Sequence, residues 1–124
     1  MQLRTLPDSY AVVRLEPGAD LPEWVDKGPF RSVTRTEHEV SVVCRDYDVP
    51  EGENVDRGFT LLETMGPHDF SLTGVIASLV EPLAEAEVPI FVISTFESDY
   101  VLVRSSDLAR AADALEGAGH EFAA

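Results

Sequence analysis

The sequence has one cysteine, Cys44, one lysine, Lys27, and no long apolar run. A single cysteine excludes an internal disulfide and any metal site built from several cysteines. No stretch approaches the ~20 apolar residues that a helix needs to cross a bilayer. The start, MQLRTLPDSY, lacks the apolar core of a signal peptide, so we expect a cytoplasmic protein. No histidine motif accompanies Cys44, which favours a buried structural thiol over a nucleophile.

Basic residues are scarce throughout. The chain has 9 Lys and Arg against 23 Asp and Glu, a formal net charge of −14. A nucleic-acid-binding protein needs a cationic surface to contact phosphates, so this composition excludes that class. Anionic membrane surfaces are disfavoured for the same reason. The acidic excess itself indicates no more than a soluble, self-repelling surface.

The composition is nevertheless that of a folded protein. Of 124 residues, 44% are hydrophobic and 26% are charged, which is too apolar for a disordered chain. This length predicts one compact unit, or at most two small units that share a core.

The first half contains short β-branched runs bounded by turn residues. A helical turn or two is expected over residues 21–25, before Gly28-Pro29 stops it. Residues 46–57 are rich in Asp, Glu, Pro and Gly and predict a solvated loop. Four strands are expected, of which the second and third form a hairpin: Tyr10–Leu15, Phe30–Thr36, Glu39–Cys44 and Gly58–Thr64.

The second half begins with a helix over Thr73–Glu85, where apolar residues recur at 75, 76, 79, 80 and 83. Pro82 has no N–H to donate to the carbonyl of Ser78, so we expect a kink or a local widening there. The nearly continuous apolar run Val88–Thr95 predicts a strand that a helix covers on at least one face.

A second strand and a second helix follow. Asp99–Arg104 should pair antiparallel with the preceding strand. Ser105 and Ser106 are candidate caps for a helix, with Asp107 in its first turn. That helix should end at a glycine, and a last short strand should follow. The residues concerned are Leu108, Ala111, Ala112 and Leu115 on the apolar face, Gly117 or Gly119 at the end, and His120–Phe122 in the strand.

The predicted order in the second half is strand, helix, strand, strand, helix, strand. This is the ferredoxin-like arrangement of an α+β fold. The first half repeats it with reduced helices. Gly66-Pro67 breaks the chain between the halves, so we expect two related units, residues 1–66 and 67–124, the first of them degenerate.

Polar residues gather where the elements of the second half begin and end. A helix N-terminus offers unpaired N–H groups and the positive end of its dipole, which suit a carboxylate. Gly74 would let a ligand approach the backbone closely. Asp99, after a strand reversal, would pair with an ammonium or guanidinium group. Together these two corners would fit a zwitterion or a basic amino acid.

Each of these residues also has a structural explanation. Ser71 or Thr73 would cap the helix, and Gly74 would pack closely against a strand. Asp99 would be an ordinary hairpin residue. Phe96 is more typical of a core residue than of a side chain that stacks on a ligand. The residues alone leave both interpretations open.

A catalytic function has less support from the sequence. Catalysis needs a nucleophile with its base, a converging pair of carboxylates or a set of metal ligands. His38, His68 and His120 are far apart and none has metal-ligand spacing, so each is expected to be a lone surface histidine. Only the pair His68-Asp69, beside the glycine, remains a candidate. No phosphate-binding glycine motif is present, so we expect neither a nucleotide nor another cofactor.

Several segments together resemble the ACT domain. These are SLTG at the helix start, then PIFVISTFESDYVLV, with SYAVVRLEP, PEWV and FRSVTRTEHEVSVVC in the first half. The branch of small tandem-ACT proteins related to the CASTOR arginine sensors is the most similar. The specific part is IST-F-x-x-DY-x-LV with the preceding D-F-S-L-T-G, and the resemblance covers nearly the whole chain.

The resemblance implies regulation by an amino acid rather than catalysis. The family's helix-opening loop matches Ser71, Leu72, Thr73, Gly74 and Val75, whose backbone amides would hold the ligand's carboxylate. Its strand-end motif matches Thr95, Phe96 and Asp99, which would surround a cationic end, as in arginine. Those sensors carry four ACT units and this chain has two, so a homodimer is implied.

Two other functions remain open. The ACT-like sheets would instead serve only to dimerise or to dock on a partner enzyme, with no ligand. A small lyase or isomerase on a ferredoxin-like scaffold is a further alternative.

Overall fold

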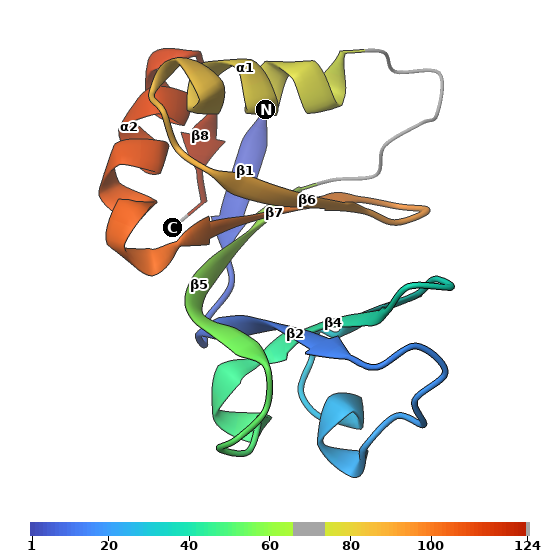
Figure 1. The fold of residues 1–124 in the computed structure, drawn as a ribbon. Coiled ribbons are helices and arrows are strands. Elements are labelled where there is room, and N and C mark those ends of the chain that lie inside the picture. The colour runs from blue at the N-terminus through green and yellow to red at the C-terminus, as the bar shows by residue number, and fades with distance from the viewer. Residues whose placement is uncertain (66–73, 124) are drawn as a thin grey trace. The chain divides into compact units, whose positions relative to one another are not determined.

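The computed structural model describes residues 1–65 and 74–123. The described chain forms two units, one of Asp8–Phe59 and one of Met1–Pro7 with Thr60–Ala124 (Figure 1). These bounds differ in position from the division expected at residues 66 and 67, because the first residues of the chain join the C-terminal elements. The assignment of two ACT-like units divided there stays a prediction.

The unit Asp8–Phe59 is a small antiparallel sheet with two 3₁₀ helices. Its strands lie in the order β3-β4-β2-β5, and residues 32–35 pair with residues 40–43 as the predicted hairpin. Apolar side chains of β2 and β4 form its core with Val25 and Val49. The elements are β2 (Tyr10–Leu15), η1 (Glu23–Asp26), β3 (Ser32–Arg35), β4 (Val40–Arg45), η2 (Asp46–Asp48) and the start of β5 (Val55–Thr64).

The expectation of a solvated loop over residues 46–57 is wrong at both ends. Residues 46–48 form η2, and β5 already begins at Val55. Side chains of the charged run hold this segment. Asp46 Oδ2 accepts a 2.5 Å hydrogen bond from Ser9 Oγ, and Arg57 donates a 2.8 Å bond to the carbonyl of Val49. Hydrogen bonds of charged side chains therefore fix the backbone of this segment, although its sequence has no apolar periodicity.

The second unit has the ferredoxin-like α+β fold that the sequence predicts. Its strands lie in the order β6-β7-β5-β1-β8. The short strand β1 was not predicted, and it lies antiparallel to β5 and parallel to β8. The elements are β1 (Gln2–Thr5), α1 (Val75–Glu85), β6 (Ile90–Ser94), β7 (Asp99–Arg104), η3 (Ser105–Asp107), α2 (Leu108–Gly117) and β8 (Glu121–Phe122).

The two helices of this unit cover one face of its sheet (Figure 1). Leu79 and Leu83 of α1 and Ala111 and Leu115 of α2 are buried, as the helical spacing predicts. Together with apolar residues of the sheet they form one core. The strand residues in it are Leu3, Leu62, Val101 and Val103.

Two details of this unit differ from the prediction. The side chains of Ser105 and Ser106 do not cap α2, whose N-cap is Asp107, with no side-chain cap hydrogen bond. Ser105 Oγ instead lies 2.8 Å from Thr60 Oγ1. The apolar strand β6 is also less covered than expected: Phe91 is 47% and Val92 37% exposed. Within the described residues, β6 pairs only with β7 and lies at the edge of the sheet.

His120 is the third correction, because it is buried rather than a surface histidine. Its Nε2 lies 2.8 Å from the carbonyl oxygen of Ser78. This is the carbonyl that Pro82 leaves without its helical N–H donor. The bond requires the hydrogen on Nε2, and Nδ1 has no partner among the described residues. The imidazole thus replaces the hydrogen bond that Pro82 cannot donate, and α1 continues past the proline.

Replacing the imidazole should therefore expose the defect that Pro82 makes. His120→Phe should lower the free energy of unfolding by about 1–3 kcal/mol, because the Ser78 carbonyl loses the donor on the buried imidazole. Pro82→Ala restores an N–H four residues after Ser78. The same histidine substitution should therefore cost less in the Pro82→Ala background. Urea unfolding of all four proteins measures the coupling, and equal costs in both backgrounds would contradict this account.

Candidate functional site

The glycine corner begins at Gly74. Ser71, Leu72 and Thr73, like His68 and Asp69, lie outside the described residues. Gly74 is the N-cap of α1 in the left-handed region, with φ 79°, where a side chain is strained. A Cβ at Gly74 would meet nothing within 4 Å. The glycine is therefore explained by its backbone conformation and not by close packing.

The N-terminus of α1 has no compensating group among the described side chains. It has no side-chain cap hydrogen bond and no acidic residue in its first turn. Ser78 turns back onto the helix, with Oγ donating a 2.7 Å bond to the carbonyl of Val75. The first N–H groups and the positive end of the dipole therefore suit an anion.

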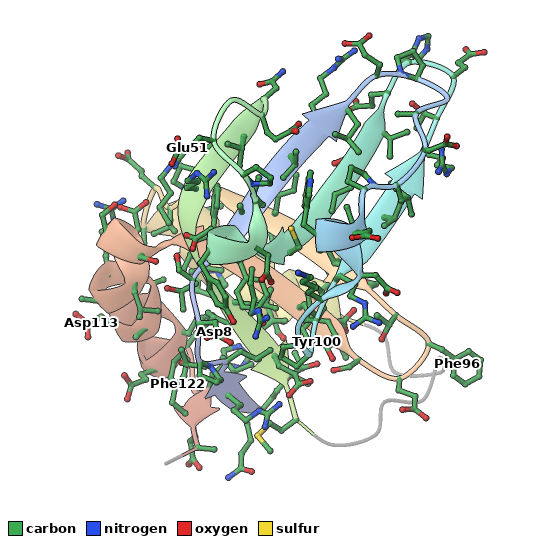
Figure 2. The ribbon with its side chains drawn as sticks, turned by 90° about the horizontal axis from the view of Figure 1, so that it is seen from below. Asp8, Glu51, Phe96, Tyr100, Asp113 and Phe122 are labelled. Carbon is green, nitrogen blue, oxygen red and sulfur yellow. The ribbon has the colours of Figure 1, made fainter. Side chains whose placement is uncertain are left out.

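Thr95 and Phe96 belong to the turn between β6 and β7. The Thr95 amide donates to the carbonyl of Ser98 at 2.8 Å, and the Ser98 amide donates to Thr95 Oγ1 at 3.1 Å. Thr95 thus fixes the turn. Phe96 is 80% exposed, so the expectation that it is a core residue is wrong. It projects from the turn between β6 and β7 (Figure 2).

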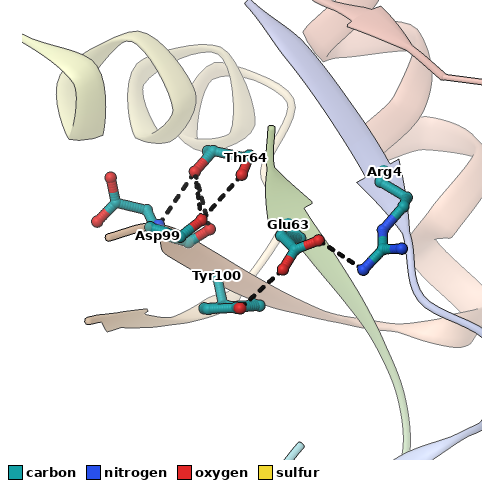
Figure 3. Close-up of polar contacts among 6 residues, drawn as sticks. Arg4, Glu63, Thr64, Asp99 and Tyr100 are labelled. Atoms are coloured by element: carbon teal, nitrogen blue, oxygen red, sulfur yellow. Dashed lines mark hydrogen bonds and ion pairs between the residues drawn. The ribbon is translucent and has the colours of Figure 1, made fainter. Parts of the chain in front are cut away.

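Asp99 is held firmly at the start of β7. Its Oδ1 accepts a 2.6 Å bond from Ser94 Oγ. Its backbone amide donates to Thr64 Oγ1 at 3.0 Å, and that hydroxyl donates to the Asp99 carbonyl at 3.1 Å (Figure 3). Among the described residues, Oδ2 has no such partner. Asp99 is partly exposed, and the bond from Ser94 orients its carboxylate.

The structure brings three of the predicted residues, Thr95, Phe96 and Asp99, into one turn. Gly74 and Val75 open α1, whose N-terminal end lies toward the same end of the unit as that turn in Figure 1. Sequence reasoning did not single out Thr64. Its signal was weak, because a threonine at the end of a strand is common.

A second polar cluster lies on β1, β5 and β7. Glu63 accepts a 2.7 Å bond from the Tyr100 hydroxyl and forms a 2.7 Å ion pair with Arg4 (Figure 3). Burial raises the pKa of Tyr100 to about 12, with a further contribution from the bond to Glu63. Both Glu63 oxygens are thus engaged, which indicates a structural role. The cluster was missed because Arg4 lies on the unpredicted strand β1.

The described residues give little support for a metal site, a membrane-spanning helix or a nucleophilic thiol. No group of three or more His, Cys, Asp and Glu side chains there could hold a metal ion. No helix of that part is long and apolar enough to span a membrane. Cys44 is buried as predicted, and burial, with Asp48 and Asp46 nearby, raises the pKa of its thiol to about 11. A thiol with this pKa is a poor nucleophile.

One of the solved structures that match this chain has substantial sequence identity to it. Protein Atu0741 from Agobacterium tumefaciens is 41% identical to this chain, with a TM-score of 0.94. The match covers 98% of this chain and 91% of that one. No curated protein matches the chain.

More distant structures share the fold alone. The ligand-free regulatory subunit of aspartate kinase from Thermus thermophilus is 11% identical, with a TM-score of 0.63 over 90% of this chain and 93% of that one. Aspartate kinase from Clostridium acetobutylicum is 13% identical, with a TM-score of 0.67 over 94% of this chain and 33% of that one.

Two family models match the sequence. One describes an N-terminal domain and matches residues 8–52, within the unit Asp8–Phe59. The other describes the ACT domain and matches residues 54–117, which include α1, β6, β7 and α2. Because this match spans more than half of the 124 residues, the chain belongs to the ACT domain family.

Proposed function

We propose that this protein is a regulatory ACT protein that binds an amino acid at the two corners of its second unit. The observation that carries the proposal is the pairing of opposite chemistries in one unit. The start of α1 has no capping side chain among the described residues, and Asp99 has an oriented carboxylate. An amino acid presents the complementary groups, a carboxylate and an ammonium.

The N-terminus of α1 would bind the carboxylate. Backbone N–H groups there are fixed by the helix, so they need no rearrangement on binding. The left-handed Gly74 carries no side chain that would block the approach. The parts played by Ser71, Leu72 and Thr73 rest on the resemblance to the family's helix-opening loop, and Val75 continues that loop into α1.

Asp99 would bind the cationic end of the ligand. Ser94 orients the carboxylate, and Thr64 fixes the backbone that carries it. A fixed carboxylate pairs well with a guanidinium, which has donors in a rigid fork. We therefore propose a basic amino acid such as arginine, as in the CASTOR branch, with Thr95 and Phe96 beside it.

The remaining parts of the proposal concern partners and location. A second copy of the chain is the proposed partner, and the protein would act in the cytoplasm. A module that docks on a partner enzyme without any ligand is the alternative. The exposed apolar residues Phe91 and Phe96 favour it, because such side chains are typical of protein-binding surfaces.

A thermal-shift screen of the twenty common amino acids tests ligand binding. A ligand at one hundred times its dissociation constant should raise the free energy of unfolding by about 2.7 kcal/mol. We expect lysine or arginine to raise the melting temperature most. If no amino acid changes it, the regulatory ligand is not an amino acid, and the docking module becomes the better explanation.

Asp99→Asn tests the cation contact. The amide keeps an acceptor for Ser94 Oγ, so stability should change little, while the charge is lost. A hydrogen bond to a charged group contributes about 1.5–3 kcal/mol, so affinity for a basic amino acid should fall by about 10- to 100-fold. Calorimetry measures this.

The matched control is Glu97→Gln, which removes an exposed charge from the same turn. It should leave the affinity for the basic amino acid nearly unchanged. Equal effects of the two substitutions would show that net charge, and not a contact with Asp99, attracts the ligand.

A further inference from the structure

The C-terminal ends of α1 and α2 meet beside a cleft of about 370 Å³ (Figure 1). This volume is within the range of about 300–1,000 Å³ that is typical of small-molecule sites. Most of the side chains around the cleft are small, so a ligand can reach the backbone of both helix ends. The lining residues are Pro82, Glu85, Ala86, Ala114, Gly117 and Ala118.

Gly117 is not required by the end of α2. The left-handed residue that terminates this helix is Gly119, with φ 98°. Its amide donates to the carbonyl of Glu116, and the next amide donates to the carbonyl of Leu115, which are the two bonds of a Schellman motif. Gly117 is still helical, and a Cβ there would meet nothing within 4 Å. Because glycine weakens a helix relative to alanine, the fold does not explain Gly117, whose effect is to keep the cleft open.

Among the described residues, both helix ends have backbone carbonyls that receive no N–H. Pro89, four residues after Glu85, has no N–H to donate to the Glu85 carbonyl. The amide of Glu121, four residues after Gly117, donates to the carbonyl of Met1 instead. Neither helix has a basic residue in its last turn, where a cation often binds such carbonyls. The negative ends of two helix dipoles therefore meet at one cleft.

The side chains near the cleft add further acceptors. Glu85 contributes a carboxylate to the lining. Arg110 is the only basic residue of α2, and its guanidinium already donates to the carbonyl of Glu87 at 3.2 Å. His120, which follows α2 and bonds to Ser78 of α1, has a buried Nδ1 with no partner among the described residues. Acceptors thus outnumber donors between these helices, which favours a ligand with several N–H groups.

We propose that this cleft binds a short aliphatic diamine, at a site separate from that of the proposed amino acid. One ammonium group binds the carbonyl and the carboxylate of Glu85, and the other binds the carbonyl of Gly117. Each ammonium brings three donors, and the methylene chain lies over the small apolar side chains of the cleft. An amino acid fits less well, because its carboxylate would lie against acceptors of the same sign.

Titration with putrescine, followed by the amide signals in NMR, tests the site. A buffer with about 0.15 M sodium chloride screens the general attraction of cations to the net charge of −14. We expect saturable shifts at the amides of Ala86, Gly117 and Ala118. Butylamine, with one ammonium, and butanediol, with none, should bind about two- to fivefold more weakly for each charge lost, the effect of an exposed ion pair.

Two substitutions, each with a matched control, locate the ligand. Glu85→Gln should weaken putrescine binding about two- to fivefold. Glu81→Gln removes the same charge from an exposed position of α1 that does not line the cleft, and should change the affinity little. Gly117→Leu should abolish binding by filling the cleft, without lowering the melting temperature, because the space beyond Gly117 is open. Ala109→Leu, at an exposed position of α2 outside the cleft, should leave binding intact.

Specific and nonspecific binding give different results. Shifts spread over the acidic surface, or equal effects of Glu85→Gln and Glu81→Gln, would show attraction to net charge alone and overturn the proposal. Asp99→Asn should leave the affinity for putrescine unchanged. If Asp99→Asn abolishes binding and Gly117→Leu does not, the diamine binds at the turn between β6 and β7, and the cleft is not its site. A protein that binds no putrescine refutes the cleft site alone, since the amino-acid screen does not depend on it.

Discussion

The sheet of the second unit depends on the hydrogen bonds that β1 forms with the strands on both sides of it. β1 bonds to β5 on one side and to β8 on the other, and β8 pairs with no other strand in the described chain. The backbone of His120, one residue before β8, donates to the carbonyl of Leu115. Its ring reaches the carbonyl of Ser78 in the first turn of α1. The strand at the start of the chain thus positions the group that completes α1.

The same dependence reaches the candidate site through β5. Thr64, at the end of β5, pairs in register with Leu3 of β1 and bonds to the backbone of Asp99. The Ser98 hydroxyl returns a 2.8 Å bond to the Thr64 carbonyl. The carboxylate at the turn is therefore held by the central strands rather than by the turn alone. This rigidity favours recognition, because a fixed group loses little entropy when a ligand binds.

Local patterns in the sequence predicted the elements well, and long-range contacts limited the rest. The helical spacing predicted the buried residues of both helices, although Ile76 on the predicted apolar face of α1 is 37% exposed. Runs of strand-forming residues predicted seven of the eight strands in the described chain, with errors of a few residues at their ends. β1 was missed because its four residues, three of them polar, show no clear pattern. The burial of His120 was missed because its partner, Ser78, lies 42 residues away.

Local patterns also located some residues of the candidate site, while others depend on long-range contacts. Glycine and aspartate at the ends of elements are visible in a sequence, and the structure finds Gly74 and Asp99 there. Phe96 was misjudged, because an aromatic residue between two strands does not reveal whether a neighbouring element covers it. The hydroxyls of Ser94 and Thr64 carry no signal until the strands are paired.

The parallel pairing of β1 with β8 has a consequence for biosynthesis. Leu3 pairs with Phe122, so a contact between nearly the first and nearly the last residue closes the sheet. Contacts of such long sequence separation slow folding, because the chain between them must be ordered first. During translation, the unit cannot close its sheet until the last strand has left the ribosome. The unit Asp8–Phe59 makes its own strand pairings earlier and can fold first.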